Sequence, residues 1–178
     1  KKALSMGADD LIVVQDDAFR DIDAYATAQV LTAAIKKIDK YDLVICGRQA
    51  SDWDNSLVPI GIAEFLGFPC VTIAQAIDIA DNRAIVKRVL DDGYEVVEAK
   101  LPLVITVSNE LGEPRYPTLR GIMAAGRKEP TIWSASDLFI DGSSLTSKLR
   151  VANLSISTND RSCEFIQGET DEDSGRLL

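Results

Sequence analysis

Two short apolar runs enclose a longer stretch of helical spacing near the start of the chain. Residues 11–14 and 43–46 are branched and apolar, which is typical of strands that are buried on both faces. Residues 21–38 repeat apolar side chains at helical spacing, with acids near the start and lysines near the end, as the helix dipole favours. A strand, a helix and a strand in this span predict a βαβ unit with neighbouring parallel strands and a right-handed crossover.

The middle of the chain changes from this α/β pattern to that of a β-hairpin. After a polar loop, the spacing predicts a helix over residues 57–66, ended by Gly67, and then a strand over residues 69–79. Residues 85–90 and 94–98 are rich in branched and aromatic residues and flank an Asp-Asp-Gly turn. Glycine supplies the positive φ that a tight turn needs, so these two stretches predict a hairpin.

The last third of the chain contains shorter predicted elements. The pattern indicates a strand over residues 103–107, a short exposed helix over 118–125, a turn at 136–138 and a last strand over 149–156. The segment from residue 158 to 178 holds six acidic and two basic residues. Such a segment is usually a solvated extension and less often an arm that becomes ordered on a partner.

These elements predict an α/β fold with an open, mostly parallel, three-layer sheet of the Rossmann-like type, a β-hairpin and a C-terminal arm. One domain is expected over residues 1–157 and an acidic extension over 158–178, since 178 residues are enough for one core of ordinary size. Residues 1–7 have the pattern of the last turns of a helix closed by a glycine. We therefore expect the N-terminal strand and most of the first helix to lie upstream of Lys1.

Composition argues against several classes of function. The chain has 19 Lys and Arg against 28 Asp and Glu, and its net charge of −9 argues against a nucleic-acid binder, because phosphates favour clustered cations. It has no His, which excludes Ser-His, Cys-His and His-metal sites. The three Cys form no CxxC pair, so no zinc site or disulfide framework is indicated and a reducing compartment fits. No apolar run approaches the roughly 18 residues of a membrane span. We expect a cytoplasmic protein, or a mitochondrial matrix protein in a eukaryote.

The polar loop after residue 46 is the first candidate site, because it follows a strand of a parallel sheet and leads into a helix. Ligands of such sheets bind beyond the carboxyl ends of the strands, and a helix start offers free N–H groups that suit a phosphate. Residues 52–56 are also typical N-caps, and the loop alone favours this simpler interpretation. Trp53 either stacks on a planar ring or seals the loop base. The candidate ligand-binding residues are Gly47, Arg48, Gln49, Ala50, Asp52, Trp53, Asn55, Ser56, Leu57 and Val58.

Residues 113–130 form the second candidate, a basic patch within an acidic chain. Four basic residues face two acidic ones in this segment. Leu119 and Met123 are four residues apart and share one face of the predicted helix, and together with Arg120 they have the composition of a docking hot spot. The alternative is that both apolar residues close the helix onto the core.

Several motifs resemble those of the β subunit of electron transfer flavoprotein, and the resemblance covers most of the chain. The hairpin strings and residues 113–123 are the most specific, because ordinary packing does not dictate a Glu-Pro-Arg-Tyr sequence. The motifs are Ala3-Leu4-Ser5-Met6-Gly7-Ala8-Asp9, Cys46-Gly47-Arg48-Gln49-Ala50, Val86-Lys87-Arg88, Asp92-Gly93-Tyr94-Glu95-Val96, Leu101-Pro102-Leu103-Val104-Ile105-Thr106, Asn109-Glu110 and Glu113-Pro114-Arg115-Tyr116-Pro117-Thr118-Leu119-Arg120-Gly121-Ile122-Met123.

The resemblance implies an adenine-nucleotide α-hydrolase-like fold and a heterodimer with an α subunit. In this family α chiefly holds FAD, while β holds a structural AMP on a motif that begins Gly-Arg-Gln-Ala and corresponds to residues 47–58. The segment after Glu-Pro-Arg-Tyr is similar to the recognition loop whose leucine anchors partner dehydrogenases, and Leu119 has that position. The resemblance therefore favours the ligand-site interpretation of the loop and the docking interpretation of the patch.

Three residues of the loop region depart from the family pattern. Trp53 stands where small or polar residues are usual, Leu57 where Gln is common, and Pro59 where Gly is frequent. We therefore expect side-chain bonds to the phosphate to be missing and backbone contacts to remain.

The implied function is that of an electron carrier rather than an enzyme. The subunit would accept electrons from acyl-CoA-type dehydrogenases through the FAD of the αβ heterodimer and pass them towards the respiratory chain. One alternative is a bifurcating or nitrogen-fixation-type flavoprotein, in which β holds a second FAD in place of AMP. Another alternative is a free-standing adenine-nucleotide sensor. No catalytic residue or metal ligand is assigned.

Overall fold

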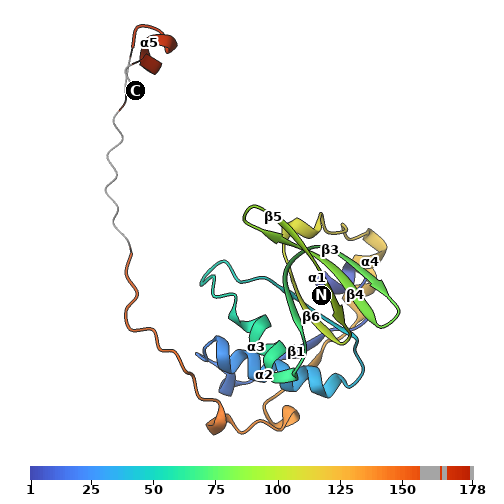
Figure 1. Ribbon diagram of the computed structural model, residues 1–178. Helices are drawn as coiled ribbons and strands as arrows, with labels where there is room; N and C mark the ends of the chain where they lie inside the picture. The colour runs from blue at the N-terminus through green and yellow to red at the C-terminus, as the bar shows by residue number, and fades with distance from the viewer. Residues whose placement is uncertain (157–164, 166–167, 177–178) are drawn as a thin grey trace.

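The computed structural model describes residues 1–156, 165 and 168–176 (Figure 1). Its α-helices are α1 (Lys2–Ser5), α2 (Ala24–Ile38), α3 (Leu57–Leu66), α4 (Leu119–Arg127) and α5 (Asp171–Arg176). Its strands are β1 (Ile12–Val14), β2 (Leu43–Gly47), β3 (Cys70–Ala80), β4 (Arg83–Leu90), β5 (Gly93–Lys100), β6 (Leu103–Val107) and β7 (Thr131–Trp133). The short 3-10 turns are η1 (Asp17–Phe19), η2 (Asn109–Leu111), η3 (Ser136–Leu138) and η4 (Gly142–Ser144).

The main sheet is mixed, with a parallel half and an antiparallel half. Its strand order is β2-β6-β3-β4-β5. β6 runs parallel to both β2 and β3, whereas β3, β4 and β5 form an antiparallel meander that contains the predicted hairpin. β1 and β7 form a separate parallel pair. With β1–β7 included, three of the five strand pairings of the described residues are parallel, and this open, mostly parallel arrangement with helices confirms the predicted α/β class.

The predicted pairing of the first two strands is wrong. β1 pairs with β7 and β2 pairs with β6, so α2 connects strands of two different sheets. Hydrophobic periodicity indicates a helix between two strands, but it does not say which strands become neighbours. The expected burial on both faces is wrong as well, since residues 12–14 are half-buried and Ile45 is 54% exposed. Within the described residues each of these strands has a sheet neighbour on one side only.

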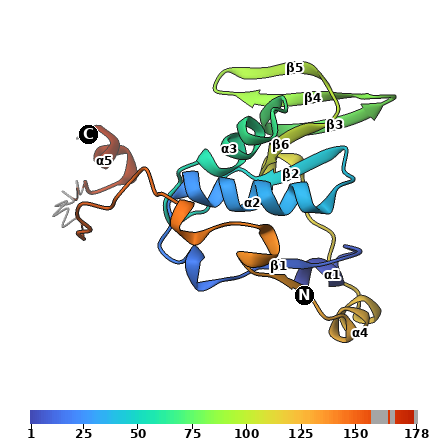
Figure 2. The same cartoon turned by 90° about the horizontal axis from the view of Figure 1, so that it is seen from below.

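β6 forms the centre of the core. Its residues Leu103, Val104 and Ile105 are fully buried, because β2 and β3 flank it on both sides. Val104 packs with Ile62 of α3 and with α2, while Leu103 and Ile105 pack with Val86 of the hairpin. α2 also packs against β7 and η3 through a second set of apolar residues. Figure 2 accordingly shows α2 between the main sheet and β1.

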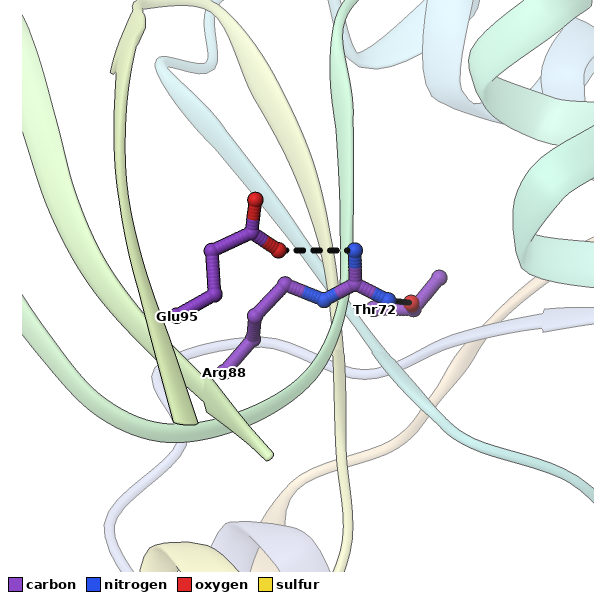
Figure 3. A network of polar contacts seen from close by, with 3 residues as sticks. All are labelled: Thr72, Arg88 and Glu95. Carbon is purple, nitrogen blue, oxygen red and sulfur yellow. Dashed lines mark hydrogen bonds and ion pairs between the residues drawn. The ribbon is translucent and has the colours of Figure 1, made fainter. Parts of the chain in front are cut away.

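Arg88 joins three strands of the main sheet (Figure 3). Its Nη2 donates a hydrogen bond to Oγ1 of Thr72 on β3 at 3.0 Å. Its Nη1 donates to Oε2 of Glu95 on β5 at 3.3 Å, and the two side chains form an ion pair. The Val-Lys-Arg string that marked the family resemblance therefore has a structural role in the hairpin.

Most of the other predicted elements are confirmed. The predicted helix over 57–66 matches α3, and the predicted short helix near 118–125 is α4. α2 begins at Ala24 rather than residue 21, because Asp23 is its N-cap and accepts the N–H of Ala26 at 2.9 Å. α1 ends just before Gly7, whose φ of 109° confirms the expected glycine at a helix end.

The predicted last strand over residues 149–156 is wrong. This segment has no sheet partner among the described residues; it passes the start of α2 and then leads away from the folded body (Figures 1 and 2). Its alternating apolar residues indicated an extended chain, but the described sheets have no strand beside it. Leu154 and Ile156 are consequently exposed. In the predicted extension over 158–178, only residue 165 and residues 168–176 are described, and residues 171–176 form α5.

Candidate functional site

The loop after β2 forms one side of a cavity of about 1660 Å³. Residues 21–23, the N-terminal half of α2, the end of β2, the start of α3 and residues 147–153 also line it. Each of the ten predicted ligand-binding residues lines this cavity: Gly47, Arg48, Gln49, Ala50, Asp52, Trp53, Asn55, Ser56, Leu57 and Val58. The structure thus brings the predicted residues together at the end of a parallel strand.

Backbone and side-chain bonds fix the shape of the loop. The N–H of Arg48 donates to the carbonyl of Val107 at 2.9 Å, which ties the loop to the end of β6. The Gln49 amide donates from Nε2 to Oδ1 of Asp54 at 2.8 Å, and its Oε1 accepts the hydroxyl proton of Ser56. Gln49 therefore joins the two ends of the turn that precedes α3.

The N-cap interpretation of the loop is wrong. Ser56 occupies the N-cap position of α3, but its side chain makes no capping bond and its φ is 53°. Asp54 accepts from Gln49 instead, and Asp52 accepts the N–H of Trp53 at 2.9 Å. Within the described part of the chain, the first N–H groups of α3 thus receive no side-chain cap, and they carry the positive end of the helix dipole.

Trp53 does not seal the base of the loop. Its side chain is 56% exposed, and it lines the cavity. An exposed indole at the rim of a cavity is available to stack on a planar ring. Of the two interpretations of Trp53, the geometry therefore favours stacking.

Charged groups of both signs line the cavity. Arg48 belongs to the loop, and Lys148 and Arg150 belong to the segment after η4. Asp23 lies at the start of α2, where burial alone would raise its pKa, but N–H groups that include those of Ala26, Leu149 and Lys148 lower it overall. Hydrogen bonds from backbone N–H groups therefore stabilise the ionised carboxylate of Asp23.

Cys46 stands in the cavity wall at the end of β2. Burial, together with the nearby Cys70, raises the pKa of its thiol. A raised pKa leaves the thiol protonated near neutral pH, so this cysteine does not have the properties of a nucleophile.

The second candidate site is the outer face of α4. Leu119 is 76% exposed and Met123 is 57% exposed, so the alternative in which both residues close the helix onto the core is wrong. Arg120 is exposed beside them. The helix starts at Thr118, whose Oγ1 accepts the N–H of Gly121 at 3.1 Å.

Two further large apolar residues of this segment are exposed, and we call the set the α4 face: Tyr116 just before the helix, and Leu119, Ile122 and Met123 on it. Sequence reasoning missed Tyr116 and Ile122. The spacing of three between Leu119 and Ile122 was the available signal, since residues three and four apart on a helix are neighbours. A run of four large exposed apolar side chains is typical of a docking surface.

The opposite side of α4 packs closely on α1. A Cβ added to Gly121 would lie 2.6 Å from the carbonyl oxygen of Ser5, so only glycine allows this approach. The Nζ of Lys1 donates to the carbonyl of Gly126 at 3.3 Å, and Lys128 donates to the carbonyl of Asp9. The N-terminal segment therefore fixes which face of α4 points outward.

The described residues contain neither a metal-binding cluster nor a membrane-crossing helix. They include no group of three or more acidic or cysteine side chains that is arranged to hold a metal ion. They also include no helix that is both long and apolar enough to cross a membrane.

Comparison with known proteins identifies the family of the chain. Residues 1–138 match the model of the electron transfer flavoprotein domain. The chain belongs to the electron transfer flavoprotein family. The chain is 42% identical over 176 residues to the electron transfer flavoprotein subunit beta of Thermoanaerobacterium thermosaccharolyticum. It is 45% identical over 138 residues to CarD, a subunit of the caffeyl-CoA reductase-Etf complex of Acetobacterium woodii, and 41% identical over 144 residues to the subunit beta of Clostridium acetobutylicum.

These relatives of the electron transfer flavoprotein family are longer than the chain. The alignments cover 97%, 78% and 81% of this chain, but 67%, 53% and 55% of the respective relatives. The family resemblance drawn from the sequence motifs is confirmed.

Proposed function

We propose that the chain acts as the β subunit of an electron transfer flavoprotein, an electron carrier rather than an enzyme. The observation that carries the proposal is the match to β subunits over 97% of the chain at 42% identity. In this role the αβ heterodimer accepts electrons from acyl-CoA-type dehydrogenases and passes them towards the respiratory chain from a cytoplasmic or matrix location. The flavin supplies the redox chemistry, and the residues of this chain bind, orient and dock.

A nucleotide fits the cavity beside α3. The uncapped start of α3 and Arg48 offer N–H donors and positive charge to a phosphate, and the exposed Trp53 offers a ring surface to a base. Leu57 is exposed at the same rim and provides no hydrogen bond, so the contacts that the start of α3 makes to the phosphate come from its backbone N–H groups. A bound AMP would stabilise the fold by mass action.

An α subunit would cover apolar surface that the described residues leave exposed. Leu149, Val151, Leu154 and Ile156 are large apolar residues of the extended segment, and all are exposed. Exposed apolar residues along an extended segment are typical of an arm that becomes ordered on a partner. FAD would be held chiefly by that α subunit.

The α4 face would dock the dehydrogenase. Leu119 is its most exposed helical residue, and Arg120 and Arg127 give the surroundings a positive charge. An apolar anchor surrounded by charge suits a partner with a small apolar pocket and an acidic rim.

A bifurcating flavoprotein is the second candidate function. It is favoured by the 45% identity to CarD, whose name places it in a caffeyl-CoA reductase-Etf complex. In that form the β site would hold a second FAD in place of AMP.

The experiment is to denature the purified αβ complex and identify the released nucleotides by mass. AMP together with one FAD per complex supports the carrier, whereas two FAD and no AMP support the bifurcating form. A protein that purifies as a stable monomer and ignores α in a pull-down, but binds adenine nucleotides, would instead be a free-standing sensor.

A further inference from the structure

A short segment from the C-terminal part of the chain completes the cavity. Residues 147–153, which we call the strap, follow η4 and line the cavity together with the loop after β2. Figure 2 shows this part of the chain, in orange, passing the start of α2 before it continues towards α5. The strap comes from more than 90 residues beyond the loop, so only the fold brings the two together.

Asp23 fastens the strap to the start of α2. One carboxylate oxygen, Oδ1, accepts the N–H of Ala26 at 2.9 Å and caps the helix. The other oxygen, Oδ2, accepts the N–H groups of Lys148 at 2.5 Å and Leu149 at 2.8 Å. The backbone N–H of Asp23 also donates to Oγ of Ser147 at 3.1 Å. A single residue therefore joins the helix cap to three consecutive strap residues.

Apolar burial does not explain why the strap lies here. Leu149 and Val151 are 62% and 58% exposed, so the large apolar side chains of the strap bury little surface. The Nζ of Lys148 lies 5.5 Å from the ring centroid of Tyr25, which adds a weak contact. Hydrogen bonds to the Asp23 carboxylate are thus the main attachment, and bonds to a charged acceptor are the strong kind.

The attachment brings a second guanidinium group to the cavity. Arg150 lines the cavity and has no ion pair or hydrogen bond among the described residues, and Arg48 lines the same cavity from the loop. Two arginines from different segments suit the oxygens of a phosphate better than one, because guanidinium groups can each donate two parallel bonds.

We propose that the strap is a wall of the nucleotide site, with Arg150 as a phosphate-binding residue and Asp23 as the positioning residue that holds it. This inference rests on the proposed nucleotide site and adds residues that the loop motif does not contain. It assigns the ligand to the phosphate-bearing class, which AMP and FAD share.

The first test is Asp23→Asn, measured as AMP and FAD affinity by calorimetry on the full-length protein in the complex it forms. Asn retains an oxygen to cap α2, but its amide NH₂ cannot accept from Lys148 and Leu149. We expect AMP or FAD to bind at least about fivefold more weakly, and the amide protons of both strap residues to exchange faster with solvent.

Asp16→Asn is the matched control. Asp16 has the same arrangement outside the cavity, since its Oδ1 accepts from Ala18 at 3.0 Å and its Oδ2 accepts from Ala135 at 3.0 Å. Its substitution should leave nucleotide affinity unchanged. Equal weakening by both substitutions would show a general loss of stability and would overturn the role of the strap.

Arg150→Gln tests the ligand contact on an exposed residue, so it remains decisive even if Asp23→Asn fails to fold. We expect roughly tenfold weaker binding, partial recovery with Arg150→Lys and no effect of Arg176→Gln on α5. Wild-type affinity in Arg150→Gln overturns the inference while leaving the nucleotide site intact. If the wild-type protein binds neither AMP nor FAD, the nucleotide site and the strap inference are both overturned.

Discussion

The cavity and the α4 face differ in how they are built. The cavity is concave and gathers residues from the loop after β2, the start of α2 and the strap. Its shape depends on hydrogen bonds such as those of Gln49 and Asp23. The α4 face lies within residues 116–123 and presents exposed apolar side chains that belong to none of the core clusters of the described residues. A nucleotide site needs several converging segments, whereas a docking anchor needs only one short helix held in place.

This difference predicts that single substitutions will separate the two functions. Changes on the α4 face should affect electron transfer from the dehydrogenase and leave nucleotide binding intact. Changes in the cavity should affect nucleotide binding first, because each cavity residue contributes one of several contacts.

The largest effect is expected from Leu119→Asp. A charge at an apolar anchor opposes burial in the partner's pocket, and a hot spot typically contributes about 2 kcal/mol or more, roughly thirtyfold in affinity. Electron transfer from the dehydrogenase, followed by flavin absorbance at low partner concentration, should fall by at least that factor. Leu90→Asp, at an exposed position of β4, is the control and should leave the transfer rate near that of the wild type.

Gly121→Ala should have the next largest effect. The added Cβ would meet the backbone carbonyl of Ser5 at 2.6 Å, so α4 must move away from α1 at a cost of about 1–3 kcal/mol. Thermal unfolding and dehydrogenase affinity should both decline, while AMP affinity should not. In the same helix Gly126→Ala has open space around the new methyl group and should be neutral or slightly stabilising. Similar behaviour of the two variants would contradict the role given to the α1 contact.

How much could be predicted from the sequence also differs between the two regions. The spacing of Leu119 and Met123 predicted that they share one helix face, because a helix translates spacing into a surface. It left open whether that face is exposed or buried, and the family resemblance favoured docking. The loop residues became a candidate site from their position after a parallel strand, and the family resemblance then favoured ligand binding over N-capping. The strap could not be predicted, since its pattern indicated a strand and its attachment depends on Asp23, a residue far away in sequence.

Dependence on contacts between distant parts of the sequence also explains the error in strand pairing. Branched apolar runs predicted β1 and β2 correctly, but neighbours in a sheet are determined by packing between distant segments. β7 and β6, which pair with them, lie about 120 and 60 residues further along the chain. The Val-Lys-Arg string of the hairpin indicated the family, and the structure gives its arginine a local role as well. Arg88 bonds to Thr72 and Glu95 and so joins three strands.

Leu57→Gln should strengthen nucleotide binding in the cavity. Leu57 is exposed at the rim, beside the uncapped start of α3, and a Gln amide there can donate to a phosphate. One added hydrogen bond contributes about 1 kcal/mol, so AMP should bind roughly fivefold more tightly in calorimetry. Ile60→Gln, one turn along the same helix and also exposed, should give no gain. An unchanged affinity in Leu57→Gln would place the phosphate elsewhere in the cavity.

The smallest effect is expected from lowering the pH. Acid should weaken the attachment of the strap before it affects the α4 face. Burial alone would raise the pKa of Asp23, but its backbone N–H donors lower the pKa overall, so the folded state favours the carboxylate. A lowered folded pKa stabilises the protein at every pH above the ordinary carboxyl range, and this contribution is lost as the pH falls through the folded value. The free energy of unfolding of the wild type should therefore exceed that of Asp23→Asn at neutral pH. The difference should shrink below about pH 4, as measured by urea denaturation at a series of pH values. A difference that stays constant down to pH 2 would mean that the Asp23 carboxylate is not what holds the strap.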